Sequence, residues 1–419
     1  MSGMTAVFKR LCAGGVMLLL SACGLGVGGS SAGNSSPGAS SPGITDSEVV
    51  IGYTGAITGP VAVFGKGIGY GQNAYYQYIN AQGGVKMKDG KTRKIRFIPY
   101  DDAFQNAQSL QNTRQLCEQD KAFAIVGAVG QPVSADETYV NQAKCPQILI
   151  AAGQLSVGQI SNYYQAPLWP PIAAEGAVYA KYISNTLKGT KVAFLKLASS
   201  VGDDFETGFK DELNRDGNSG ALVATETIAA TDTTAEAQMT RLAASKAGIL
   251  VFVGVAGITP QVIKLSHSTG WNPQLFVYSA IAAVSVIQAA GLDQSKGLIT
   301  ASWLKPVTDT SDPAISLFQD NIRKYGNGLA PTDGVALQGY THGIAMVELL
   351  KRMPQPTRES LMTTLYSLNK VQLPTVLNGI TMNTSKTNHR PIQAYQLLQF
   401  DGSKYNSIGG VIEPEPGVD

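Results

Sequence analysis

A chain of 419 residues is longer than one ordinary domain and suits two. Its composition, 44% hydrophobic and 15% charged, is sufficient to bury a full core and excludes a disordered protein. The 32 basic and 30 acidic residues nearly balance, with no basic stripe and no charge block, so we expect no nucleic-acid partner and no charged membrane-binding surface.

The first 23 residues have the pattern of a bacterial lipoprotein signal peptide. Lys9 and Arg10 form a positive start, and Leu11–Leu20 is an apolar run too short to span a membrane. Leu20-Ser21-Ala22-Cys23 then matches a lipobox, in which Cys23 carries the lipid after cleavage. A plain secretory signal with an incidental cysteine is the alternative. We expect residues 1–23 to be a signal peptide and the folded part to be extracytoplasmic, lipid-anchored to the cell membrane.

Residues 24–45 are rich in Gly, Ser and Pro and carry no charged side chain. A segment of this composition has nothing to pack into a core and behaves as a flexible linker. We interpret it as a tether between the lipid anchor and the folded lobes.

From residue 46 onward, short apolar strands alternate with amphipathic helices, which is typical of parallel sheets covered on both faces. The sequence predicts a first series of strands at Val49–Gly55, Lys94–Tyr100, Ala122–Val129 and Gln147–Ala152, with helices at Gly67–Ala81, Ala107–Gln119 and Val133–Ala143. Right-handed crossovers make this series one doubly wound lobe.

The alternation restarts after Asn162–Pro171, a proline- and aromatic-rich stretch that we interpret as a crossing between lobes. The second series predicts strands at Lys191–Ala198, Ala221–Ile228, Gly248–Val255 and Gln274–Ser279, with helices at Ala173–Leu187, Asp203–Asp216, Ala235–Lys246 and Pro260–Thr269. A second crossing at Gly297–Pro306 precedes three more helices and a hairpin that turns at Asp401-Gly402.

The fold predicted is therefore α/β, with two doubly wound Rossmann-like lobes joined by a multi-strand hinge. We assign residues 46–168 plus 301–375 to the N-terminal lobe and residues 169–300 plus 376–419 to the C-terminal lobe. Two such lobes leave one cleft between them, which can close around a ligand by hinge motion.

Cys117 and Cys145 are the two cysteines that remain after the signal peptide and Cys23 are accounted for. Cys117 ends a predicted helix and Cys145 immediately precedes a predicted strand of the same lobe. Outside the cytoplasm a disulfide between them is permitted, and we expect one. Two buried free thiols are the alternative.

The chain lacks the residue sets of a catalytic or metal site. Its three histidines, His267, His342 and His389, have no metal-ligand spacing, and no nucleophile, base and orienting residue occur together. Asp101-Asp102 and Asp203-Asp204 follow strands, where paired carboxylates could act as acid and base, but we favour turns and helix caps. We expect no enzymatic activity, no metal and no cofactor.

Four motifs occur in one order: a glycine-containing block at Gly52–Gly65, an Ile-Asn-Ala-Gln-Gly-Gly-Val turn at Ile79–Val85, a Tyr-Asp-Asp strand end at Tyr100–Asp102, and Ala-Ile-Val-Gly at Ala124–Gly127. This order resembles the periplasmic binding proteins of branched-chain amino acid ABC transporters, the leucine/isoleucine/valine-binding family. The resemblance covers nearly all of the mature chain. It implies the periplasmic binding protein type I fold and a receptor that delivers a small solute to an ABC transporter permease.

The resemblance also implies ligand contacts in the first lobe. The aromatic residues that contact the ligand fall at Phe64 and Tyr340, and the contact to the ligand carboxylate falls near Gly130 or Gln131. Small and hydroxyl-bearing residues complete this side. The full set of implied first-lobe contacts is Thr58, Phe64, Gly130, Gln131, Gly153, Gln154, Ser156 and Tyr340.

In the second lobe the sequence departs from the family. Val201-Gly202 replaces the Tyr-Gly that helps to hold the ligand ammonium, and the acid expected within Tyr278–Val286 is absent. A buried ammonium needs a carboxylate or several acceptors, which Asp203 or Asp204 could supply. The second-lobe contacts are thus expected at Val201, Asp203 and Tyr278. We expect a neutral or weakly acidic small solute, with urea-like amides, aromatic acids and short polyols all open.

The function predicted is capture of a small solute by a monomeric, lipid-anchored receptor, followed by delivery to an ABC importer. A ligand sensor for a signalling partner is one alternative. A secreted lipoprotein hydrolase that uses Asp101, Asp102 or Asp203 as acid or base is the other.

Overall fold

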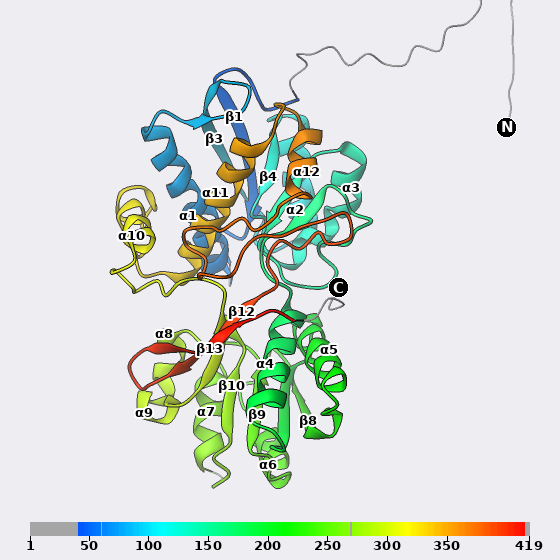
Figure 1. Cartoon of the computed structure of the whole chain (residues 1–419), viewed down its shortest axis with the longest axis vertical. Helices are drawn as coiled ribbons and strands as arrows, with labels where there is room; N and C mark the ends of the chain where they lie inside the picture. Colours follow the sequence, from blue (N-terminus) through cyan, green and yellow to red (C-terminus); the bar gives the residue numbers. More distant parts are fainter. Residues whose placement is uncertain (1–40, 60, 269, 415–419) are drawn as a thin grey trace, which may run out of the picture. The chain divides into compact units, whose positions relative to one another are not determined.

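The structure, a computed structural model, describes residues 41–59, 61–268 and 270–414. The predicted lipidation site, Cys23, and nearly all of the tether lie outside these residues. None of the helices within the described ranges is long and apolar enough to cross a membrane. The described chain forms two α/β lobes, each built on its own sheet (Figure 1).

A six-stranded sheet in the order β2-β3-β1-β4-β5-β6 forms the centre of the first lobe. Its strands are β1 (Glu48–Gly55), β2 (Val85–Lys86), β3 (Thr92–Asp101), β4 (Ala124–Val126), β5 (Gln147–Ile150) and β6 (Gln165–Pro167). All neighbouring pairs are parallel except β2 and β3. Residues 49–55 of β1 are all buried, as expected for a central parallel strand with helices on both faces.

Six helices belong to the first lobe, three of them from late in the sequence. They are α1 (Ala62–Ala81), α2 (Asn106–Glu118), α3 (Glu137–Ala143), α10 (Pro313–Tyr325), α11 (Gly334–Arg352) and α12 (Arg358–Leu365). Helices α1 and α11 pack side by side, and glycines permit their close approach. A Cβ atom at Gly71 of α1 would lie 2.3 Å from the carbonyl oxygen of Ala336 in α11.

The second lobe is built on a seven-stranded sheet in the order β13-β12-β11-β10-β9-β7-β8. Its strands are β7 (Val192–Leu197), β8 (Leu222–Ile228), β9 (Ile249–Val253), β10 (Gln274–Val277), β11 (Ile299–Ser302), β12 (Tyr395–Phe400) and β13 (Tyr405–Ile412). Strands β7 to β11 pair in parallel, whereas β12 and β13 add to β11 as an antiparallel hairpin. The accompanying helices are α4 (Ile172–Thr186), α5 (Ser200–Arg215), α6 (Glu236–Ala244), α7 (Thr259–Ser268), α8 (Val284–Ile287) and α9 (Leu292–Ser295).

The predicted fold class is confirmed, whereas the lobe boundaries stay a prediction. Residues 376–394 were assigned to the second lobe, whereas several of their contacts are to the first (Figure 1). The His389 ring stacks on Tyr366 with centroids 3.7 Å apart, and Tyr366 donates a 2.8 Å hydrogen bond to the carbonyl of Tyr163, which precedes β6. The chain joins the second sheet only at Tyr395, where β12 begins.

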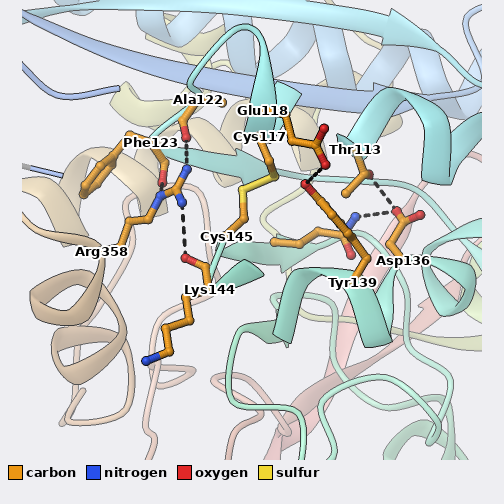
Figure 2. The surroundings of a disulfide bond; sticks show 11 residues. Thr113, Cys117, Glu118, Ala122, Phe123, Asp136, Tyr139, Lys144, Cys145 and Arg358 are labelled. Atoms are coloured by element: carbon orange, nitrogen blue, oxygen red, sulfur yellow. Dashed lines mark hydrogen bonds between the residues drawn. A yellow bond between two sulfur atoms is a disulfide. The ribbon is translucent and has the colours of Figure 1, made fainter. Parts of the chain in front are cut away.

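The structure contains the predicted disulfide between Cys117, in the last turn of α2, and Cys145, just before β5 (Figure 2). Beside it, the guanidinium of Arg358 donates hydrogen bonds to the backbone carbonyls of Phe123 and Lys144, at 3.1 and 3.2 Å. The disulfide and Arg358 together connect α2 and α12 to the segments that begin β4 and β5.

Candidate functional site

A small cluster of apolar side chains lies near the carboxyl ends of the parallel strands of the first sheet. Tyr53, Ile68, Val129 and Ala151 are its buried members. Partly exposed side chains pack against them: Ile57, Phe64, Phe97, Trp169 and Val335. Ligands of open α/β sheets bind at the carboxyl ends of the strands, which is where the loops after β1, β4, β5 and β6 begin.

Phe64, an aromatic contact that the resemblance implies, lies in the first turn of α1 and is partly exposed. Trp169 lies in the same cluster and was not among the predicted contacts. Trp169 belongs to the stretch Asn162–Pro171, for which the sequence predicts only a crossing between the lobes. A partly exposed tryptophan directly after a strand end could have been proposed from that stretch.

Thr58 is exposed in the loop after β1, and the carboxylate of Asp101 holds it in place. The Thr58 hydroxyl donates to Asp101 Oδ2 at 2.5 Å, and the backbone N–H groups of Ile57 and Thr58 donate to Oδ1 at 2.8 and 3.2 Å. Burial acts to raise the pKa of Asp101, but these hydrogen bonds outweigh it and lower the pKa below its ordinary value. Asp101 is thus an ionised acceptor that organises the loop.

Gly130 follows β4 with a φ of +71°, a conformation that favours glycine. A Cβ atom there would lie 2.7 Å from a ring carbon of Phe104, so the ring occupies the space that a side chain would need. Phe104 itself has a φ of +62°, and the preceding Ala103 has a φ of +47°. Gln131, the alternative predicted contact, is exposed. Phe104 was not predicted, since no sequence signal places it against Gly130.

The loop after β5 carries three predicted contacts and touches the second lobe. Gly153 accepts a 2.8 Å hydrogen bond from the backbone of Ile172, at the start of α4. The Oε1 atom of Gln154 is buried and has no hydrogen-bond partner among the described residues, whereas Ser156 is exposed. A buried acceptor without a donor is costly, which makes Gln154 a candidate to receive a hydrogen bond from a ligand.

The same loop is linked to α5 through Leu155. The backbone N–H of Leu155 donates a 2.9 Å hydrogen bond to Asp204 Oδ2, and its carbonyl accepts a 2.8 Å bond from Arg390. Burial raises the pKa of Asp204, although the Leu155 hydrogen bond and the charge of Arg390 act in the opposite direction. The carboxyl ends of the two sheets therefore meet at this loop.

Among the predicted second-lobe contacts, Val201 is partly buried and packs against the core, and Asp203 is exposed. Lys196 Nζ lies 2.8 Å from Asp203 Oδ1 and also bonds to Glu206. Asp203 is thus an ion-pair partner on the surface of α5. Ser199, which precedes α5, has a buried hydroxyl with no hydrogen-bond partner among the described residues.

Tyr340 occupies a different place from the one predicted. Its side chain is 1% exposed and packs edge-on against Tyr75 and Phe318, with centroids 4.9 and 5.2 Å apart. Its hydroxyl accepts a 2.7 Å hydrogen bond from the Asn321 amide. Tyr340 is a core residue between α1, α10 and α11, and we leave it out of the candidate site.

A family model described as Periplasmic binding protein matches residues 48–405. The chain belongs to the periplasmic binding protein family. It is a binding protein and not an enzyme. An amino acid binding protein of Pseudomonas aeruginosa is 25% identical over 301 residues, which cover 70% of this chain and 76% of that protein.

Two solved structures share the fold. A branched chain amino acid ABC transporter protein from Thermus thermophilus with bound valine has a TM-score of 0.74 at 18% identity, covering 87% of this chain and 96% of that chain. A solute binding protein of an ABC transporter from R. palustris, in complex with 4-hydroxybenzoate, has a TM-score of 0.69 at 18% identity and covers 88% and 98%. These likenesses support the periplasmic binding protein type I fold.

This periplasmic binding protein has a buried carboxylate, Glu175, beside the segment Tyr278–Val286, in which the family's acidic residue is absent. Glu175, in the first turn of α4, accepts hydrogen bonds from the Ser279 backbone N–H at 2.7 Å and from the Ser279 hydroxyl at 2.6 Å. Burial raises the pKa of Glu175 to about 7, against the opposing effect of these bonds and of Tyr179. Tyr278, a predicted contact, is itself buried and packs against Phe205.

No group of three or more His, Cys, Asp or Glu residues within the described ranges could hold a metal ion. His342 is fully buried in α11, and burial lowers its pKa to about 4, so it is neutral at pH 7. His389 is stacked on Tyr366.

Proposed function

We propose that this chain is a lipid-anchored, extracytoplasmic receptor that captures a small solute between its lobes and delivers it to an ABC importer. The observation that carries the proposal is the meeting of the two sheets at the loop after β5, where Leu155 bonds to Asp204 of α5. A solute held there contacts both lobes at once. Partly exposed aromatic faces, Phe64 and Trp169, line the first-lobe side.

The ligands bound in the two structural relatives, valine and 4-hydroxybenzoate, support a small organic solute. The residues of this chain favour one other than a standard branched-chain amino acid. The segment from Tyr278 to Val286 has no acid, and the nearby Glu175 is buried with its oxygens already accepting hydrogen bonds. A ligand ammonium would therefore lack a carboxylate there.

The mechanism follows from the two-lobe architecture. The open form admits the solute, hinge motion at the crossings closes the lobes, and the closed form docks on the permease. Ligand binding favours the closed form only if the solute gains contacts in it that the open form lacks. Gln154 and Ser199, each with a buried polar atom that has no partner among the described residues, are candidates for such contacts.

A thermal-shift screen of the mature chain against a metabolite library tests solute binding. We expect at least one compound to raise the melting temperature at millimolar concentration, because a ligand that binds only the folded state stabilises it. No shift with any compound would refute a solute receptor.

Anchoring is tested separately. The mass of the mature protein should include a lipid on Cys23, and Cys23→Ser should release the protein from membranes. Deletion of the gene should abolish uptake of the solute found in the screen, whereas a signalling defect with normal uptake would favour the sensor.

A further inference from the structure

A site that binds a carboxylate presents hydrogen-bond donors to it, whereas donors of the first-lobe loop after β1 are already bonded within the lobe. Donors of the loop after β1 point at Asp101, which belongs to the same lobe. The Asp101 carboxylate accepts from the Thr58 hydroxyl and from the backbone N–H groups of Ile57 and Thr58. An ionised carboxylate cannot donate, so the Thr58 hydroxyl proton lies on the side of Asp101. Thr58 can offer a ligand only the lone pairs of its oxygen.

In the loop after β4, the Gly130 position offers a ligand no donor, whereas the amide of the exposed Gln131 does. Gly130 has no side chain, and Phe104 fills the space where a serine hydroxyl would stand. The Gly130 N–H donates to the carbonyl of Ala151 at 3.2 Å, and Pro132 has no N–H. A ring therefore replaces a donor at the position where the resemblance expected a contact to the ligand carboxylate.

The loop after β5 adds an acceptor. Gln154 Oε1 is buried and without a partner among the described residues, while the adjacent N–H of Leu155 is taken by Asp204. The first-lobe side of the site therefore holds two acceptors, the Thr58 hydroxyl oxygen and Gln154 Oε1, and the negative charge of Asp101, beside its aromatic side chains. Beside Thr58, another anion would meet the charge of Asp101, whereas an N–H or O–H group of a ligand would meet the Thr58 oxygen as acceptor.

We infer that the ligand is a neutral molecule with an apolar or aromatic body and hydrogen-bond donors, not a carboxylate, and that Asp101 is the positioning residue that sets this preference through Thr58. The inference rests on the proposed function. It narrows the solute to neutral amides, phenols or alcohols and excludes the aromatic acids.

Asp101→Asn gives a sharp test because the introduced amide has only one way to fit. Its oxygen must face the N–H groups of Ile57, Thr58 and Ala103, all of which bond to Oδ1. Its NH₂ group then faces Thr58 Oγ1 and donates to it. The Thr58 hydroxyl proton is released toward the ligand, so the same oxygen changes from acceptor to donor.

The experiment measures binding by calorimetry for matched pairs of carboxylate and amide, such as 4-hydroxybenzoate with 4-hydroxybenzamide and octanoate with octanamide, chosen around the hits of the thermal-shift screen. For the wild-type chain we expect the amide or another neutral donor to bind at least tenfold more tightly than its carboxylate partner. In Asp101→Asn the ratio should fall at least tenfold. Thr58→Val combined with Asp101→Asn should show a smaller fall, because the switching hydroxyl is gone.

Each outcome decides a different question. A tighter carboxylate overturns the inference and leaves the solute receptor standing. An unchanged ratio in Asp101→Asn, in a variant whose melting temperature shows it to be folded, overturns the role of Asp101. A screen without any hit removes the proposed function and the inference with it.

Discussion

The backbone N–H of Leu155, in the loop after β5 of the first lobe, donates a 2.9 Å hydrogen bond to the carboxylate of Asp204 on α5 of the second. Arg390 completes the junction by donating to the carbonyl of the same leucine at 2.8 Å. Leu155 thus accepts a hydrogen bond from Arg390, late in the chain, and donates one to Asp204 in the second lobe. The junction couples the candidate ligand loop directly to the relative position of the lobes.

Asp204→Ala should loosen this junction. The substitution removes the acceptor of the Leu155 N–H, and we expect a loss of about 1–2 kcal/mol in the free energy of unfolding, since Asp204 is only partly buried. Native-state hydrogen exchange should show faster exchange of the Leu155 amide. The control is Asp203→Ala, which removes the ion pair of the exposed Asp203 with Lys196 and should cost at most about 0.5 kcal/mol. Equal protection of Leu155 in both variants would contradict the junction.

Glu175 should make stability depend on pH between about 4.5 and 7. Burial raises its folded-state pKa to about 7 from an ordinary value near 4.5, so the folded state binds the proton more tightly than the unfolded state. The free energy of unfolding should therefore fall as pH rises through this window, by up to about 3 kcal/mol. The neutral form also suits the local hydrogen bonds. The Tyr179 hydroxyl lies 2.9 Å from Glu175 Oε1 and 2.8 Å from the carbonyl of Val277, but it has only one proton to donate. A protonated Glu175 supplies the second proton.

Glu175→Gln tests this by urea denaturation at pH 5 and pH 8. The amide keeps the shape and cannot ionise, so the variant should match the wild type at pH 5 and exceed it in stability at pH 8. Glu226→Gln is the control, because Glu226 forms a surface ion pair with Arg241 that lowers its pKa. A Glu175→Gln variant with the same pH slope as the wild type would show that Glu175 is ionised in the folded protein.

The sequence predicted the alternation of strands and helices well, because a continuous apolar run such as Val49–Gly55 has few alternatives to a buried parallel strand. It overextended β4, predicted as Ala122–Val129, since Gly127 and Gly130 take positive φ values and end the strand. An irregular segment such as residues 376–394 carries no periodicity that assigns it to one lobe.

The candidate site was harder to predict for a physical reason. The resemblance gave Tyr340 as a ligand contact, but a position in a motif cannot distinguish a buried core residue from a residue of a ligand cleft. Glu175 reaches Ser279 across 104 residues of sequence, a contact that only the fold creates. Thr58, in the loop after β1, and Phe64, in the first turn of α1, follow closely on a strand that the sequence identifies. Their role as ligand contacts remains a prediction.

The disulfide between Cys117 and Cys145 should stabilise the first lobe. It closes a loop with a sequence separation of 28, for which chain entropy gives about 3–4 kcal/mol. Alkylation of the unfolded mature protein without reductant should label neither cysteine, and dithiothreitol should lower the free energy of unfolding by about 2–4 kcal/mol. In the variant with both Cys117→Ala and Cys145→Ala, dithiothreitol should have no effect. Labelling of both cysteines before reduction would show that the bond is absent.

The contact between α1 and α11 depends on glycine at position 71. Gly71→Ala places a methyl group 2.3 Å from the Ala336 carbonyl oxygen, closer than packed atoms can approach, so the helices must separate. We expect a loss of at least about 2 kcal/mol in the free energy of unfolding, measured by urea denaturation. Gly220→Ala is the control, since a Cβ atom there meets nothing within 4 Å, and it should change stability by less than about 0.5 kcal/mol. If Gly71→Ala were as stable as Gly220→Ala, the two helices would have to pack less closely than the structure shows. The first-lobe loops would then rest on a softer support, because α1 carries Phe64 in its first turn.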